Sequence, residues 1–180
     1  MSVSERADRT KPTPPEVQRF LDQIDLVLSP FQLTRNDEYW RIVTRSYLNP
    51  PDEISYQAVY GNPHVEFRVG VFDTPNRYLV TIEIAKRTDP NRGEEFSLNQ
   101  FEMVTGLSPF SAQKTRGEEH LRLIGDYLKR IVHDAAMSEI LRGQYWFSFR
   151  FDYRDWATTP SMEAEMQTAF KKSRALKTRG

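Results

Sequence analysis

The stretch ISYQAVYGNPHVEFRVGVFDTPNRYLVTIEIA, residues 54–85, carries the clearest structural pattern of the chain, because apolar and polar residues alternate through three successive segments of it. Alternation with a period of two is typical of antiparallel strands that bury one face. The segments are Ile54–Tyr60, Val65–Phe72 and Tyr78–Ala85, and short turns that contain Asn, Pro or Asp separate them. The stretch is therefore predicted to form a meander of antiparallel strands.

The predicted pairing of these strands turns their apolar residues to one face. If Gly61 lies opposite His64 in the first hairpin, and Phe72 lies opposite Arg77 in the second, both hairpins present their apolar residues on the same side. A slip by one residue in either hairpin would turn one apolar set toward solvent. The agreement between the two hairpins supports the meander.

One more strand is predicted before this core and one well after it. Trp40 and Ile42 recur at alternate positions in Tyr39–Ser46, and aromatic residues recur at alternate positions in Tyr145–Phe151. With these additions the prediction is an antiparallel sheet of about five strands, a four-strand meander and a C-terminal aromatic strand.

Two helices are predicted to pack on the sheet. Apolar residues recur at helical spacing in Val17–Leu28, and Thr13 with Glu16 forms a predicted capping box at the start of that helix. The longest helical pattern is Thr115–Leu141, and a short helix is predicted around Phe101. The fold class is therefore α+β. The predicted buried stripe of the long helix is Leu121, Ile124, Leu128, Ile131 and Ala135.

Length and composition bound the domain organisation. The chain has 180 residues, no cysteine and a formal net charge of zero, which fits one domain at a typical ~150 residues per domain. We predict a disordered lead-in over residues 1–14, a single domain over 15–157 and a basic, helical tail over 158–180. The lack of cysteine excludes disulfides, thiolate zinc sites and cysteine nucleophiles. No apolar run suits a secretory signal or a membrane span, so a cytoplasmic location is expected.

No motif in the sequence dictates a reaction. The eight glycines form neither a phosphate-binding P-loop nor a GxGxxG turn, and the chain lacks GxSxG and HExxH. The three histidines are too scattered to share one metal ion. No cofactor and no metal are therefore predicted.

The polar face of the predicted sheet carries a candidate site. The predicted register places Glu66 opposite Glu83, Arg68 diagonal to Glu83, and Gln57 opposite Arg68. Two carboxylates that face each other raise the pKa of one of them, which is how acid/base pairs and divalent-metal sites are formed. The alternative is that arginines neutralise these carboxylates on an exposed surface. The candidate arginines are Arg41, Arg45 and Arg68.

Two further surfaces are candidates for partner binding. Trp146 is expected to be partly exposed in the aromatic strand. Lys171, Lys172 and Arg174 belong to the basic tail. That tail is either a solvated appendage or a segment that docks on a partner protein, nucleic acid or anionic lipid.

These observations favour a non-enzymatic, cytoplasmic protein-binding module whose partner is another protein. Motifs for catalytic loops are missing, whereas Arg, Tyr and Trp, which are enriched at binding hot spots, are plentiful. The order of a helix followed by aromatic and Arg-bearing strands is similar to small bacterial domains of unknown role, some of them toxin-neutralising, but no motif identifies a family. A bacterial neutralising or adaptor protein is one form that such a binding module takes. The alternatives are a hydrolase or metal-dependent enzyme that uses Glu66 and Glu83, and nucleic-acid contact through the basic tail.

Overall fold

The computed structural model describes residues 3–45, 53–74, 77–87, 95–105 and 117–146, together with positions 107, 110 and 115. Neighbouring strands all pair antiparallel, and their order in the sheet is their order in the chain. The elements are β1 (Val3–Asp8), α1 (Pro15–Leu28), the 3-10 helix η1 (Ser29–Phe31), β2 (Thr34–Arg45), β3 (Glu53–Gly61), β4 (Val65–Thr74), β5 (Arg77–Lys86), β6 (Glu95–Ser97), α2 (Leu98–Thr105), α3 (Gly117–Ile131) and α4 (Ala135–Leu141).

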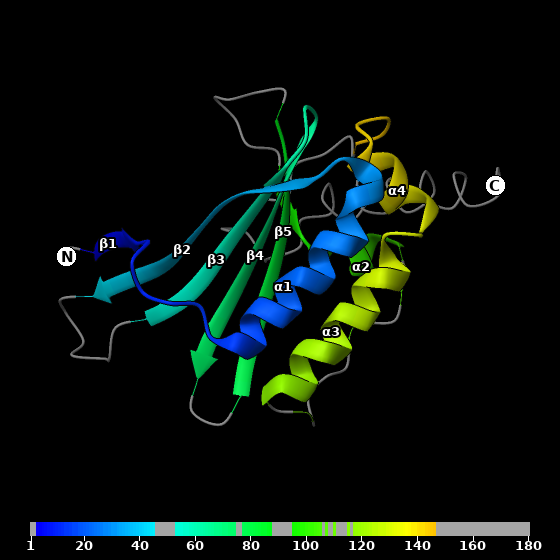
Figure 1. Ribbon diagram of the computed structural model, residues 1–180. Helices are drawn as coiled ribbons and strands as arrows, with labels where there is room; N and C mark the ends of the chain where they lie inside the picture. The colour runs from blue at the N-terminus through cyan, green and yellow to red at the C-terminus, as the bar shows by residue number, and fades with distance from the viewer. Residues whose placement is uncertain are drawn as a thin grey trace, which may run out of the picture.

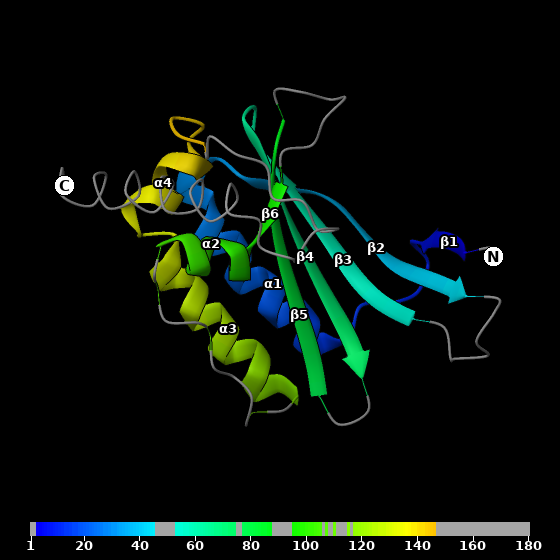
Figure 2. The same cartoon turned by 180° about the vertical axis from the view of Figure 1, so that it is seen from behind.

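Two of the helices form a layer on one side of this sheet. Helices α1 and α3 run side by side in front of the strands in Figure 1, and in the view from behind the strands lie in front of α1 (Figure 2). The molecule therefore has one helical layer against an antiparallel meander. The predicted α+β class, with an N-terminal helix and a helix from the second half of the chain on the sheet, is confirmed.

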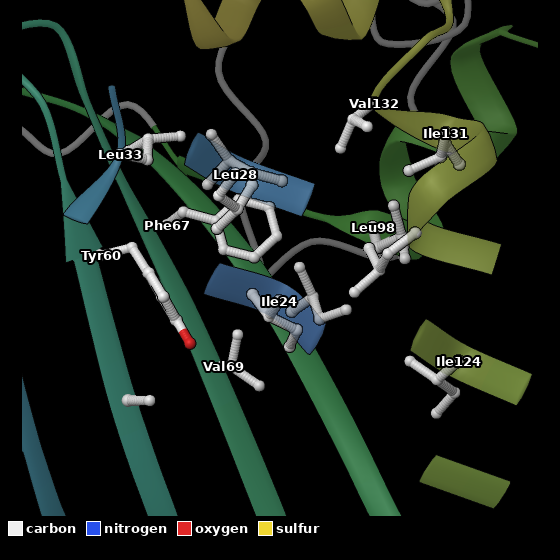
Figure 3. Packing of buried hydrophobic residues seen from close by; sticks show 14 of the residues in the cluster. Ile24, Leu28, Leu33, Tyr60, Phe67, Val69, Leu98, Ile124, Ile131 and Val132 are labelled. Carbon is white, nitrogen blue, oxygen red and sulfur yellow. The ribbon is translucent and has the colours of Figure 1, made fainter. Parts of the chain in front are cut away.

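The hydrophobic core lies between these two layers. Ile24 and Leu28 of α1 lie next to Phe67 and Val69 of β4, and Ile124 approaches from α3 (Figure 3). Each of these side chains is buried, and burying a side chain of this kind stabilises a fold by about 1.5–3 kcal/mol. The predicted helical stripe is buried as expected, except that its last member, Ala135, begins α4 and is only half-buried.

The register of the two hairpins differs by two residues from the prediction. Phe72 pairs with Leu79 rather than with Arg77. Gly61 pairs with Glu66, also two positions further along. Because side chains alternate between faces with a period of two, a shift of two residues changes every partner and leaves every face unchanged. The predicted core face is therefore confirmed, whereas the predicted cross-strand pairs are wrong.

The N-terminal segment departs from the predicted disordered lead-in. Val3–Asp8 forms the edge strand β1 and pairs along its whole length with β2. It has no apolar alternation, so the pattern that identifies the other strands is missing here. Backbone pairing with β2 holds β1 in place. An ion pair between Glu5 Oε1 and Arg41 Nε, 2.8 Å apart, adds to this pairing. The prediction of disorder is wrong for these residues, and a domain start at residue 15 leaves out one strand of the sheet.

The predicted helix Thr115–Leu141 is divided in the structure into α3 and α4. Asp134 is the N-cap of α4, and its carboxylate accepts a hydrogen bond from the Ala136 amide (3.0 Å). Asp is among the preferred N-cap residues because its short side chain satisfies a free amide of the first turn. The single long helix was therefore a wrong prediction.

The predicted capping box of α1 is also absent. Pro14 is the N-cap and makes no side-chain cap hydrogen bond, and Pro15 opens the helix, a position that suits its fixed φ. The Thr13 hydroxyl donates instead to the Tyr56 hydroxyl (2.8 Å), and Glu16 accepts from the Tyr78 hydroxyl (2.5 Å). Both side chains therefore link the start of α1 to the sheet.

Most of the predicted C-terminal strand and tail falls on residues that the structure does not describe. The predicted aromatic strand Tyr145–Phe151 begins with two residues that are in no strand, and its remaining residues lie outside the described part of the chain, as does the predicted tail. The short helix predicted around Phe101 is confirmed as α2, and β6, which was not predicted, directly precedes it. Within the described residues, no helix is long and apolar enough to cross a membrane.

Candidate functional site

The sheet has a face that α1 and α3 do not cover, here called the open face. Its side chains come from the strand positions that alternate with the core positions. On β4, for example, Arg68 points away from the core while its neighbours Phe67 and Val69 are buried in it. This is the polar face that the sequence predicted.

A hollow of about 700 Å³ opens on this face and is called the sheet hollow below. Its volume falls within the range of about 300–1,000 Å³ that is typical of ligand pockets. Strands β2 to β5 contribute most of its lining. The lining residues are Asn36, Asp37, Tyr39, Arg41, Gln57, Val59, Glu66, Arg68, Phe72, Thr81, Glu83 and Arg87.

The structure brings half of the predicted site residues together in the sheet hollow. These are Arg41, Gln57, Glu66, Arg68 and Glu83. The backbone of Arg45 belongs to β2, but its side chain, like Lys171, Lys172 and Arg174, lies outside the described part of the structure. Trp146 is partly exposed, as predicted, but it lies elsewhere, 5.3 Å from the ring of Phe96 between centroids.

The observed register corrects the predicted pairing of Glu66 with Glu83. Glu66 lies opposite Ala85, and Glu83 lies opposite Arg68. Gln57 lies opposite Gly70 rather than opposite Arg68. The guanidinium group of an arginine, not a second carboxylate, is therefore the cross-strand neighbour of Glu83.

Arg68 is the centre of an ion-pair network in the hollow. Its Nε atom lies 2.6 Å from Glu66 Oε1, and its Nη1 atom lies 3.1 Å from Glu95 Oε2 on β6. Burial by itself lowers the pKa of Arg68, but the hydrogen bond to Glu66 and the charges of Glu66, Glu95 and Glu83 outweigh it and raise the pKa. Arg68 therefore neutralises Glu66, as the alternative interpretation of the sequence predicted.

Two more ion pairs lie at the β1 side of the open face. Arg41 Nε lies 2.8 Å from Glu5 Oε1, and Arg9 Nη2 lies 2.7 Å from Asp37 Oδ2. The hydrogen bond from Arg41 lowers the pKa of Glu5, and the hydrogen bond from Arg9 lowers the pKa of Asp37. Arg9 also lies over the ring of Tyr39, 5.2 Å from its centroid. Both carboxylates are thus held in the charged form by their partners.

Glu83 is the exception among the carboxylates of the sheet hollow. Within the described part of the chain its side chain makes no ion pair or hydrogen bond. Burial raises the pKa of Glu83, and the charge of Glu95 adds to this rise, while the charges of Arg68 and Arg41 oppose it. Among the described side chains of the hollow, none therefore satisfies the Glu83 carboxylate.

Gly70 of β4 lies between two residues that line the hollow, Gln57 of β3 and Thr81 of β5. A Cβ atom at this position would lie 2.5 Å from Thr81 Oγ1 and 3.0 Å from Gln57 Nε2. The side chains of the neighbouring strands thus close over the glycine, and a larger residue would displace them. The glycine allows Gln57 and Thr81 to approach each other across β4.

Sequence reasoning missed several residues of this face. Glu5 comes from β1, which lacks apolar alternation, and Glu95 comes from β6, whose three residues are too few for alternation to identify a strand. Asp37 follows an irregularity between Arg35 and Asp37 in the pairing of β2 with β3, which the sequence does not signal. Among the described residues, no group of three or more His, Asp or Glu side chains is placed to hold a metal ion.

Comparison of the chain with known proteins identifies no relative. No protein-family model, no curated protein and no solved structure matches the chain.

Proposed function

We propose that this chain is a non-enzymatic protein-binding domain that docks a partner protein on the open face of its sheet, as a cytoplasmic adaptor or neutralising protein would. The observation that carries the proposal is the composition of the sheet hollow, where Arg41 and Arg68 lie among Tyr39 and Phe72. Arginine and aromatic side chains are the types enriched at the centres of protein interfaces.

The ion pairs of the face support docking because they hold the arginines in place before a partner arrives. Glu66 and Glu95 hold Arg68 on two sides, and Glu5 holds Arg41. Ordering a long side chain on binding costs about 0.5–1.5 kcal/mol, so side chains that are already ordered reduce this cost.

Apolar surface next to the hollow adds to the area available for burial. Leu79 is 51% exposed and lies opposite Phe72, itself only partly buried, across the β4–β5 hairpin. An exposed leucine beside a half-buried phenylalanine extends the face toward that hairpin. The face thus combines polar positioning groups with apolar area.

The two alternatives have less support from this geometry. The enzyme alternative needs Glu66 and Glu83 as a facing pair, but Glu83 faces Arg68 and Glu66 is paired with that same arginine. The nucleic-acid alternative depends on the tail, which lies outside the described residues. The open face itself offers no excess of positive charge for phosphates.

The test is recovery of a partner from the native host with matched variants of the full chain. Thr81→Arg places a long side chain in the sheet hollow, and Glu119→Arg places the same side chain on an exposed position of α3 as the control. We expect a protein that copurifies with wild type and Glu119→Arg to be lost with Thr81→Arg at equal thermal stability. Equal recovery with both variants, or no specific copurifying protein, contradicts the proposal.

A further inference from the structure

The charges of the open face do not balance, and the imbalance indicates what the partner presents. Among the described side chains that form or pair with the sheet hollow, the carboxylates outnumber the guanidinium groups by one. The carboxylates are Glu5, Asp37, Glu66, Glu83 and Glu95, and the guanidinium groups are those of Arg9, Arg41, Arg68 and Arg87.

The excess negative charge resides at Glu83. Arg68, its cross-strand neighbour, directs Nε to Glu66 and Nη1 to Glu95. Arg41 is likewise engaged by Glu5. The guanidinium groups nearest to Glu83 are therefore committed to other carboxylates.

Arg87 does not relieve this excess either. It projects from the chain just after β5, and its Nη1 atom donates to the Asn62 carbonyl at the β3–β4 turn (2.9 Å). This contact holds Arg87 at the turn. No described side chain therefore pairs with Glu83, and we take its charge to be open to a group that enters the hollow from outside.

We infer that the partner protein inserts a basic side chain, lysine or arginine, into the sheet hollow, where the Glu83 carboxylate receives its charge. The inference rests on the proposed docking function and adds the chemistry of the occupant. It fits the walls of the hollow, since Val59 and Phe72 offer apolar surface for an alkyl stem and Glu83 offers a carboxylate for its charged end. Lysine and arginine have this combination of an apolar stem and a charged end.

The raised pKa of Glu83 supports the binding of a cation at this position. Burial and the charge of Glu95 disfavour the ionised carboxylate in the free protein. A cation beside Glu83 would reverse this effect and lower its pKa. Binding of the basic side chain should therefore strengthen as pH rises through the titration of Glu83.

The experiment uses the full chain and small probes, because they isolate the basic side chain from the rest of a partner. N-acetyl-arginine amide and N-acetyl-lysine amide are titrated while backbone amide signals are followed by NMR, with N-acetyl-citrulline amide as the neutral analogue of arginine. We expect weak, saturable shifts centred on Gly70, Thr81 and Glu83 with the basic probes and none with citrulline. Glu83→Gln should weaken the binding by about fivefold, the scale of one partly exposed ion pair.

Controls separate this inference from the proposed function. Glu119→Gln, on the exposed face of α3, should bind the basic probes as wild type does. No saturable shift at the open face, equal shifts with citrulline, or unchanged binding in Glu83→Gln would each overturn the inference. If these results occur while Thr81→Arg still abolishes recovery of the partner, the docking face stands and only the identity of its occupant is wrong.

Discussion

Asn62, at the turn between β3 and β4, offers the sharpest test of how this fold is held together. It is only 6% exposed, and its side chain makes four hydrogen bonds. Nδ2 donates to the carbonyls of Phe31 (3.0 Å) and Leu141 (2.8 Å). Oδ1 accepts from the amides of His64 (2.8 Å) and Val65 (2.9 Å). One side chain therefore joins the turn to the end of η1 and to the end of α4.

Asn62→Ala should destabilise the protein by about 3 kcal/mol. A neutral hydrogen bond contributes about 0.5–1.5 kcal/mol, so four of them amount to about 2–6 kcal/mol. We expect a loss in the lower half of this range, because the hydrogen bond from the His64 amide is only part-buried and water can replace it. In a protein of this size about 3 kcal/mol corresponds to a fall in Tm of about 6–12 °C.

The assay is urea denaturation followed by far-UV circular dichroism. Asn36→Ala is the matched control, because Asn36 is exposed and its side chain, among the described residues, makes only a local hydrogen bond with Thr34. It should change the free energy of unfolding by less than about 0.5 kcal/mol. Asn62→Asp keeps the acceptor for the His64 and Val65 amides but has no donor for the Phe31 and Leu141 carbonyls. It should therefore lower the free energy of unfolding by at least as much as Asn62→Ala. A loss below about 1 kcal/mol in Asn62→Ala would refute the role assigned to this side chain.

Three further predictions address the core, a buried polar contact and the sheet hollow. Leu128→Ala, at a position 1% exposed on α3, should cost about 2–5 kcal/mol in urea denaturation, and a loss under about 0.5 kcal/mol would contradict the packing of this helix. Tyr127→Phe removes the hydroxyl that donates to the buried Glu102 carboxyl group, so it should cost about 1–3 kcal/mol by the same assay, whereas a neutral result would show that the contact contributes nothing. Burial and Glu95 raise the pKa of Glu83, so the contribution of its protonated form to stability is present below its ordinary pKa of 4.5 and is lost as pH rises through the folded-state value. The glutamine of Glu83→Gln does not titrate, so the Tm of the variant minus the Tm of wild type should increase from acid to neutral pH. A Tm difference that stays the same across this pH range would contradict the raised pKa of Glu83.

The sequence alone determined the strands of the meander and the face to which each side chain points. In residues 54–85 the alternation of apolar and polar residues is enough, because successive side chains of a strand point to opposite faces whatever the partner strand is. That is why Gln57, Glu66, Arg68 and Glu83 could be assigned to one polar face and were found there. The buried face of α3 followed in the same way from helical spacing.

Which side chains meet on that face depends on the pairing of the strands in the folded sheet. A shift of two residues keeps every side chain on its face, so alternation cannot distinguish Glu66 from Arg68 as the partner of Glu83. The length of each turn decides between them, and at the first turn Asn62 supports that length with its bonds to His64 and Val65. Glu5 and Glu95 come from strands that the sequence does not identify, because β1 lacks apolar alternation and β6 has only three residues. Backbone pairing with β2 and with β5 makes these segments strands. The pairing of charges on this face, which leaves the Glu83 carboxylate without a partner among the described side chains, thus depends on contacts between distant segments that no local pattern encodes.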